Sequence, residues 1–244
     1  MKAGFAVSVG ALASACGHFD FDRTSDAGTS DGHDSAPDGD AFDTGELLVH
    51  FAFESDGFLR DRVSGADGTC TGCPTTTIGP HGDTAALFDG NRCIRLPAPV
   101  AQPQQFTFAV WASISSWQNA TLFGRTLNGS TTLDNTFELY IEPSPDRYLA
   151  YVNNLMIVSP GSPGAWHHVA GVFDNSVVSL YVDGALEAVF SSPSTQAMYA
   201  AGDEITVGCD VDLGNEVYLT TGAIDEVRLY SRALTPAEVS ALAQ

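Results

Sequence analysis

The sequence contains very little positive charge. Its 244 residues include 10 Lys and Arg against 30 Asp and Glu, a formal net charge of −20, and Lys2 is the single lysine. A surface of this sign repels phosphate backbones and anionic lipid head groups, so we expect no nucleic-acid partner. The chain also lacks an apolar run of about 20 residues, which leaves no candidate for a membrane-spanning helix in the mature protein.

The first residues have the composition of an export signal. Lys2 is followed by an apolar stretch and then by small residues that end at Cys16. Small residues before a cysteine resemble the bacterial lipobox, although Ala13 stands where leucine is usual. We therefore expect residues 1–15 to be a lipoprotein-type signal peptide and Cys16 to carry acyl chains that anchor the protein to the bacterial cell envelope, at the outer membrane or cell surface. An ordinary signal peptide cut near Ala15 is the alternative.

Residues 16–45 are expected to be a disordered linker. From Gly17 to Gly45 the segment contains eight Asp and one Arg, with Gly, Ser, Thr and Ala filling most of the rest. Low hydrophobicity and charge of one sign keep such a segment from collapsing. The linker would act as a flexible tether between the anchor and the rest of the chain.

From residue 46 onward the sequence predicts β-strands. The segment Val177–Val182 alternates apolar and polar residues, and the Asp-Gly dipeptide that follows it is a strong signal for a two-residue hairpin turn. Similar short segments, separated by turn residues, recur along the chain. At the C-terminus, Thr235 and Glu238 have the spacing of a capping box and predict a short helix.

Five segments in order carry a family resemblance. They are Leu47–Ser55, Ala85–Pro97, Phe106–Ile114, Gly164–Gly184 with its Trp-x-His-Val-Ala and Leu-Tyr-Val-Asp-Gly motifs, and Gly222–Leu242. Together they resemble the laminin G-like, concanavalin A-like jelly-roll domains over residues 46–244. The resemblance implies an all-β, two-sheet antiparallel jelly-roll sandwich with a short C-terminal helix. It leaves the function open, because the family holds binding modules, adhesion domains and enzyme accessory domains.

Four cysteines remain once Cys16 is set aside. An even number in an exported protein indicates two disulfides, for which three pairings exist. We favour Cys70–Cys73, which would close a small loop, and Cys93–Cys209, which would join two strands. A four-thiolate zinc site is the alternative, although the sequence contains only one Cys-x-x-Cys pair.

Asp225 is the most informative carboxylate. It shares strand parity with the apolar residues that follow it, and a carboxylate buried among apolar groups needs a pairing group, hydrogen bonds or a metal. Laminarinase-type hydrolases with the jelly-roll fold end in a similar strand, whose Asp helps bind a structural calcium ion. That resemblance implies a Ca²⁺ site made of Asp225, Glu54 and a carbonyl near Asp89 or Gly90. An ion pair between Asp225 and Arg228 is the alternative.

The sequence favours binding over catalysis. The Glu-x-Asp-x-(x)-Glu strand of the laminarinase-type enzymes is absent. Glu138 and Glu142 share one face of a predicted strand, but at strand rise they would lie roughly 13 Å apart, too far for a retaining pair.

Aromatic and amide side chains are the candidate residues for ligand binding. Trp111, Trp117 and Tyr151 offer rings on which sugars stack, and Asn153 offers an amide suited to hydroxyl groups. We therefore expect a non-catalytic envelope lipoprotein that binds a glycan or an extracellular protein at the cell surface, with Ca²⁺ as a structural ion. A polysaccharide-active hydrolase or lyase and a purely structural envelope domain are the alternatives.

Overall fold

The computed structural model describes residues 46–99, 101–127, 134–153, 155–162, 164–193 and 195–244. The expected signal peptide at residues 1–15, the expected lipidation site Cys16 and the expected linker at residues 16–45 lie outside this part of the chain. Within the described residues, no helix has the length and hydropathy that a membrane crossing needs.

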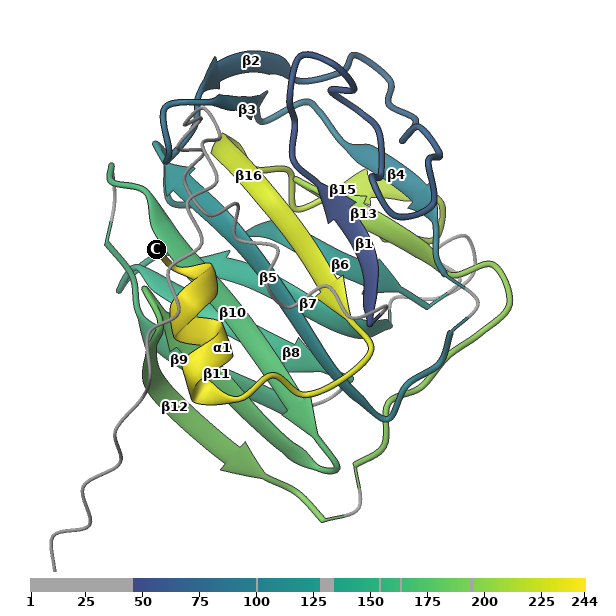
Figure 1. Ribbon diagram of the computed structural model, residues 1–244, viewed down its shortest axis with the longest axis vertical. Helices are drawn as coiled ribbons and strands as arrows, with labels where there is room; N and C mark the ends of the chain where they lie inside the picture. The colour runs from purple at the N-terminus through teal and green to yellow at the C-terminus, as the bar shows by residue number, and fades with distance from the viewer. Residues whose placement is uncertain (1–45, 100, 128–133, 154, 163, 194) are drawn as a thin grey trace, which may run out of the picture. The chain divides into compact units, whose positions relative to one another are not determined.

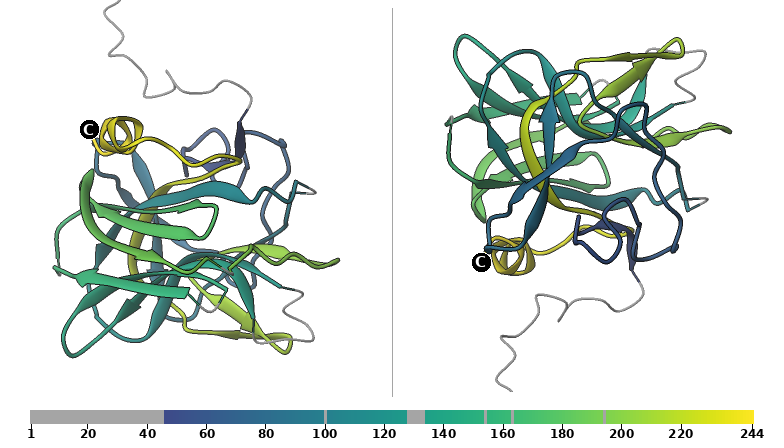
Figure 2. Two further views of the ribbon diagram at one scale, coloured as in Figure 1. Left: turned by 90° about the horizontal axis from the view of Figure 1, so that it is seen from below. Right: turned by 90° about the horizontal axis from the view of Figure 1, so that it is seen from above.

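Two antiparallel sheets stack on each other (Figures 1 and 2). In chain order the strands are β1 (Leu47–Phe51), β2 (Thr75–Ile78), β3 (Thr84–Asp89), β4 (Ile94–Pro97), β5 (Gln105–Ile114), β6 (Ala120–Thr126), β7 (Asn135–Glu142), β8 (Arg147–Val152), β9 (Leu155–Pro160), β10 (His167–Asp174), β11 (Val177–Val182), β12 (Ala185–Ser191), β13 (Glu204–Val207), β14 (Asp210–Asp212), β15 (Asn215–Val217) and β16 (Thr221–Tyr230), followed by helix α1 (Pro236–Leu242).

The strand order gives the jelly-roll topology. The eight-stranded sheet runs β12-β11-β10-β5-β16-β3-β2, with β1 also pairing with β16, and the six-stranded sheet runs β4-β13-β6-β7-β8-β9. Strands far apart in sequence, such as β5 and β16, are therefore neighbours, whereas β10, β11 and β12 form the local meander that the sequence predicts. A separate hairpin, β14-β15, follows the six-stranded sheet in the chain. The all-β sandwich expected from the sequence is confirmed.

Alternating apolar residues of both sheets fill the space between them. Phe106 and Phe108 of β5 meet Phe137 of β7, with ring centroids 5.5 and 4.6 Å apart. Gly171 of β10 leaves room for this cluster, because a Cβ there would lie 2.2 Å from the ring of Phe108. Any larger residue at this position would displace an aromatic ring of the core.

Helix α1 covers part of the outer face of the eight-stranded sheet (Figure 1). The predicted capping box is confirmed, because Thr235 accepts from the Glu238 backbone N–H and the Glu238 side chain accepts from the Thr235 backbone N–H. Val239 and Leu242 are the buried residues of the helix, and they pack in a second apolar cluster with Ala170 of β10.

Two strands end close to residues that have a positive φ. The first strand ends at Phe51 rather than Ser55, and Phe53 has a φ of 51°. Strand β15 ends at Val217, and the next residue, Tyr218, has a φ of 49°. A positive φ interrupts a strand, and no sequence signal marks either residue. The Asp183-Gly184 turn, by contrast, has the two positive φ values that its dipeptide predicts.

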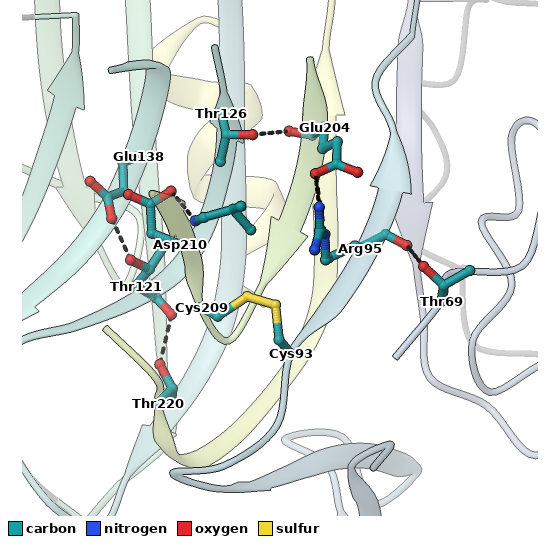
Figure 3. The surroundings of a disulfide bond; sticks show 11 residues. Thr69, Cys93, Arg95, Thr121, Thr126, Glu138, Glu204, Cys209, Asp210 and Thr220 are labelled. Carbon is teal, nitrogen blue, oxygen red and sulfur yellow. Dashed lines mark hydrogen bonds and ion pairs between the residues drawn. A yellow bond between two sulfur atoms is a disulfide. The ribbon is translucent and has the colours of Figure 1, made fainter. Parts of the chain in front are cut away.

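The structure contains the two disulfides that the sequence favoured. Cys70 bonds to Cys73 within a loop, and Cys93 bonds to Cys209 across 116 residues of chain. Figure 3 shows the second bond, which joins the residue before β4 to the residue before β14. Both of its cysteines are fully buried. A zinc site of four thiolates is thereby excluded.

Candidate functional site

The outer face of the six-stranded sheet gathers polar and aromatic side chains. Strand β7 alternates, so Phe137, Leu139 and Ile141 enter the core while Glu138 and Tyr140 point to the outside. The same parity places Tyr151 of β8 directly beside Glu138 in the ladder. These residues therefore share one surface.

Three tyrosine rings lie together on this surface. The ring centroid of Tyr140 is 6.1 Å from that of Tyr151 and 5.6 Å from that of Tyr218, both edge-on. Tyr218 lies in the loop after β15. Its backbone carbonyl accepts the backbone N–H of Thr121 at 2.8 Å, and this hydrogen bond holds the residue in place. Tyr218 is 44% exposed. The rings thus form an aromatic platform that solvent reaches.

Two buried carboxylates, Glu138 and Asp210, belong to the same region (Figure 3). Glu138 accepts from the Thr121 hydroxyl, and Asp210, at the start of β14, accepts the backbone N–H of Val211 at 2.7 Å. The amide nitrogen of Asn135 donates to both carboxylates, at 3.4 Å to Glu138 Oε2 and 3.0 Å to Asp210 Oδ2. We call Tyr140, Tyr151, Tyr218, Glu138, Asp210 and Asp212 the tyrosine–carboxylate face.

Burial disfavours the charged form of these acids. It raises the pKa of the Glu138 carboxyl to about 8, and the charge of Asp210 adds to the shift. Burial also raises the pKa of Asp210, and burial together with the charge of Asp210 raises the pKa of Asp212. Among the described residues, no Arg, Lys or His side chain hydrogen-bonds or ion-pairs with these three acids. The cluster therefore carries uncompensated negative charge when ionised.

Gly124 lies in the middle of this face. It lies between Thr206 of β13 and Glu138 of β7 in one row across the sheet. A Cβ at Gly124 would lie 3.3 Å from the Thr206 hydroxyl and 3.8 Å from Cγ of Glu138. The Thr206 hydroxyl is buried without a hydrogen-bond partner in the described part of the chain. An unpartnered hydroxyl thus lies beside Gly124, in the same row of the sheet as Glu138.

A second group of carboxylates surrounds Asp225 of β16. Asp225 is fully buried. Two carboxylate oxygens here, Oδ2 of Asp225 and Oδ1 of Asp83, lack a hydrogen-bond partner among the described residues. A Cβ at Gly79 would lie 2.1 Å from Asp83 Oδ1 and 2.6 Å from Asp225 Oδ2. The two oxygens therefore face the same small space, which is kept open by a glycine.

Arg228, the alternative partner expected for Asp225, forms its ion pair with another residue. Arg228 pairs with Glu226, not with Asp225, because a bulge between Asp225 and Arg228 shifts the strand register. Burial raises the pKa of Asp225 to about 8, and the charges of Glu226, Asp83 and Glu54 add to the shift. The predicted burial of Asp225 is therefore present without the ion pair.

Asp89 and Gly90 do not lie beside Asp225. Asp89 is opposite Thr221 in the ladder between β3 and β16, four residues away from Asp225 along β16, and it ion-pairs with Arg92. At strand rise this offset is roughly 13 Å. The residue that meets Asp225 is Asp83, just before β3, so this part of the expected ligand set is wrong.

The oxygen atoms around Asp225 fit a hard cation. Two carboxylate oxygens without partners, with the Glu54 charge close by, are the donors that Ca²⁺ prefers. Among the described residues, no group of three or more His, Cys, Asp or Glu side chains is placed to hold a metal ion, so the protein side chains at this site are the two aspartates. Asp83 and Asp225 would hold such an ion, and it would neutralise their buried charge.

The four residues expected to bind ligand do not form one surface. Tyr151 lies on the tyrosine–carboxylate face. Trp111 lies on the other sheet, edge-on to His168 with ring centroids 5.5 Å apart. Trp117 packs on Gly161, where a Cβ would lie 2.1 Å from its ring. The amide of Asn153 is occupied by the backbone of Gln196 and Met198, so it fixes a turn.

Sequence reasoning missed Tyr140, Asp210 and Asp212 of the tyrosine–carboxylate face. The signal for Tyr140 was present, because it lies between Glu138 and Glu142 on the same strand parity. No local signal identifies Asp210, whose approach to Asn135 joins residues 75 positions apart.

Comparison with known proteins identifies the family of the fold. The model of the concanavalin A-like lectin/glucanases superfamily matches residues 88–240, more than half of the chain. Among curated protein sequences, none matches significantly.

Solved structures show the same fold. Domain 4 of AbnA, an extracellular GH43 arabinanase from Geobacillus stearothermophilus in complex with arabinotriose, is 23% identical with a TM-score of 0.63, covering 82% of this chain and 98% of that one. The botulinum neurotoxin serotype G binding domain is 14% identical with a TM-score of 0.61 (81% and 50% covered). The CBM40 of the Ruminococcus gnavus IT-sialidase, bound to α2,3 sialyllactose, is 19% identical with a TM-score of 0.51 (58% and 83% covered). At these identities the likeness shows the fold alone.

Proposed function

Because the chain belongs to the concanavalin A-like lectin/glucanases superfamily, we propose that its domain is a non-catalytic glycan-binding module that uses the tyrosine–carboxylate face. The observation that carries this proposal is the platform of Tyr140, Tyr151 and Tyr218 beside buried hydrogen-bonding acids. Flat aromatic rings with one polar end pack against the apolar side of a sugar ring. Carboxyl and amide groups at the border of the platform are suited to bind its hydroxyls.

The charge of this face favours neutral glycans. Glu138, Asp210 and Asp212 have no cationic partner among the described side chains, and the whole chain has a net charge of −20. Like charges brought together at an interface disfavour binding. Of the two sugars found with the structural neighbours, arabinotriose is uncharged and sialyllactose carries a carboxylate. We therefore expect neutral oligosaccharides of the arabinotriose type to bind better.

Replacing Tyr140 by alanine is expected to weaken glycan binding at least tenfold. Tyr140 contacts both other rings, so its loss removes part of the platform and loosens the rest. A central aromatic residue of a binding site contributes about 1.4 kcal/mol or more, which corresponds to tenfold in affinity. A glycan array identifies the ligand, and isothermal titration then measures the affinity of the Tyr140→Ala variant.

The Trp111→Phe variant is the control for this experiment. Trp111 is an aromatic residue of the opposite sheet, so its replacement should leave glycan affinity unchanged. The proposal is contradicted if no glycan binds, or if Trp111→Phe and Tyr140→Ala have equal effects. Release of hydrolysis products from a glycan would instead indicate an enzyme.

We also propose that Asp225 and Asp83 hold a structural Ca²⁺ ion, with Glu54 close by. The unpartnered oxygens of Asp225 and Asp83 at the Gly79 backbone support this proposal. At a Ca²⁺ concentration 100-fold above its dissociation constant, binding stabilises the fold by about 2.7 kcal/mol. We expect Ca²⁺ to raise the melting temperature by roughly 5–10 °C over EDTA for a domain of this size.

Two variants check the position of this ion. Asp225→Asn should lose most of the Ca²⁺-dependent increase in melting temperature, because it removes a buried ligand. Asp89→Asn should keep the increase, since Asp89 lies at the rim with Arg92. Equal behaviour of the two variants would contradict the site at Asp225.

Export and anchoring complete the proposal. The two disulfides support an oxidising compartment outside the cytoplasm. With Cys16 acylated, the module would be attached to the cell envelope by its N-terminal lipid and would bind glycans at the cell surface. Metabolic labelling with a fatty acid, compared between the native chain and a Cys16→Ala variant, tests the anchor.

A further inference from the structure

The loop between β1 and β2 contains a disulfide that solvent reaches. Cys73 is exposed and Cys70 is partly buried, whereas Cys93 and Cys209 are fully buried. A thiolate must reach a sulfur atom in order to attack it, so exposed disulfides are the ones that exchange most readily. Of the two disulfides, Cys70–Cys73 is therefore the one that an external thiol reaches while the chain stays folded.

Both ends of the Cys70–Cys73 loop are fixed to the rest of the domain. Before the loop, Thr69 exchanges two backbone hydrogen bonds with Arg95, at 2.7 and 2.8 Å. After the loop, β2 begins at Thr75 and pairs with β3. None of these contacts is made by a sulfur atom, so the two thiols of a reduced loop would stay close together. Groups held in this way have a high effective concentration, which favours closure of the same bond.

Arg92 brings a positive charge to this loop. Its Nη1 donates to the backbone carbonyl of Cys73, and a Cβ at Gly72 would lie 3.9 Å from the same nitrogen. Its Nε pairs with Asp89 at 2.9 Å, which orients the guanidinium and leaves Nη1 to the loop. A neighbouring cation stabilises a thiolate, and a more stable thiolate is a better leaving group in disulfide exchange. Arg92 therefore favours opening of this disulfide.

We propose that Cys70 and Cys73 form a reversible thiol–disulfide exchange site for an external dithiol, with Cys73 as the attacked sulfur and Arg92 stabilising the leaving thiolate. A thiolate of the dithiol attacks Sγ of Cys73, the bond to Cys70 breaks, and its electron pair stays on Cys70 Sγ. The second thiolate of the dithiol then attacks its own sulfur in the mixed disulfide and releases Cys73 as a thiolate. The dithiol is oxidised to a disulfide, two electrons pass to the protein, and the protons of the dithiol return through water to the cysteine thiolates.

Dithiothreitol is the probe for this exchange, and the full chain is used. The reaction is quenched with acid at successive times, the chain is unfolded and alkylated, and peptide mass spectrometry quantifies each thiol, with Cys16 resolved on its own peptide. We expect Cys70 and Cys73 to be reduced about tenfold faster than Cys93 and Cys209, without loss of the circular dichroism of the folded chain. After dithiothreitol is removed, oxidised glutathione should restore the Cys70–Cys73 bond within the monomer.

Two pairs of variants check the role of each residue. Cys70→Ser keeps the exposed Cys73 and should form a mixed disulfide with oxidised glutathione about tenfold faster than Cys73→Ser, which keeps the partly buried Cys70. Arg92→Met should slow the reduction by dithiothreitol about threefold or more, because it removes the cation beside the leaving thiolate. Arg147→Met is the matched control, because Arg147 is similarly exposed but pairs with Glu142 on the other sheet, and its rate should be unchanged.

Three results would overturn this exchange site. The first is reduction of the two disulfides at the same rate, and the second is reduction that occurs only when the chain unfolds. The third is equal behaviour within either pair of variants, since it would remove the distinction between the two sulfurs or the contribution of Arg92. The measurements use no glycan and no metal ion, so they are independent of the proposed function.

Discussion

Replacing both Cys93 and Cys209 by alanine is expected to lower the free energy of unfolding by about 5 kcal/mol. The disulfide closes a loop across 116 residues, and in the chain-entropy model a bond of this span removes that much conformational freedom from the unfolded chain. For a domain of this size the change corresponds to a decrease in melting temperature of roughly 10–20 °C. Chemical denaturation and calorimetry of the double variant measure it.

The Cys70–Cys73 disulfide provides the control. Its cysteines are three residues apart, so the same model gives a stabilisation of about 2 kcal/mol or less. Removal of Cys93–Cys209 should also weaken glycan binding, because Cys209 directly precedes Asp210 and fixes the start of β14. If removing either disulfide had the same effect on stability, the entropic explanation would be wrong.

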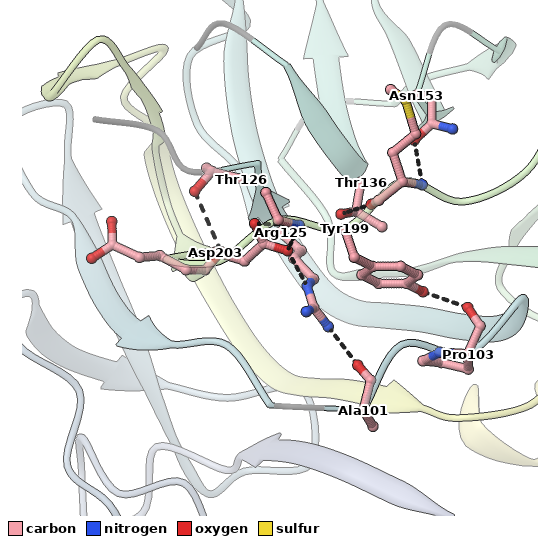
Figure 4. Close-up of polar contacts among 11 residues, drawn as sticks. Ala101, Pro103, Arg125, Thr126, Thr136, Asn153, Tyr199 and Asp203 are labelled. Atoms are coloured by element: carbon pink, nitrogen blue, oxygen red, sulfur yellow. Dashed lines mark hydrogen bonds and ion pairs between the residues drawn. The ribbon is translucent and has the colours of Figure 1, made fainter. Parts of the chain in front are cut away.

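Replacing Arg125 by methionine is expected to lower the free energy of unfolding by about 3–5 kcal/mol. Its side chain is 3% exposed and its Nε donates to Asp203 at 3.2 Å, while Nη1 donates to the Ala101 carbonyl at 3.0 Å (Figure 4). The guanidinium also lies over the ring of Tyr199, 4.5 Å from the centroid. Methionine has a similar length but no charge, so the buried Asp203 carboxylate would lose the guanidinium that donates to it.

A second substitution separates charge from packing. In Arg125→Met/Asp203→Asn neither side chain of the pair carries a charge, and the asparagine can still accept the Ala200 backbone N–H, so most of the lost stability should return. Arg60→Met is the surface control, because Arg60 and Asp67 are more than half exposed and such pairs contribute about 1 kcal/mol or less. A double variant no more stable than Arg125→Met would show that packing, rather than charge, sets the cost.

The sandwich could be predicted because its signals are local. The meander β10-β11-β12 follows from period-two alternation and from the Asp183-Gly184 turn, whose φ values of 50° and 74° suit those two residues. Strands β9 and β14 carried weaker signals. Strand β14 has only three residues, Asp-Val-Asp, and its hairpin partner is equally short, so neither shows a usable alternation.

The candidate sites depend on contacts between distant parts of the chain, which the alternation of residues within one strand does not predict. The alternation of residues along a strand shows that Trp111 and Tyr151 point away from the core. It does not show to which sheet each strand belongs, and the two residues lie on opposite sheets. The burial of Asp225 was likewise predictable from its strand. Its approach to Asp83 was not, because that contact depends on the turn at Gly79 and on how β3 pairs with β16.

The position of β1 determines how the module is presented. Glu46 enters beside the end of β16, where its carbonyl accepts the Ser231 backbone N–H at 2.8 Å, so the chain joins the domain on the eight-stranded sheet. The three tyrosines lie on the six-stranded sheet. Any support that holds the domain through Glu46 is therefore attached to the sheet opposite the one that carries the three tyrosines.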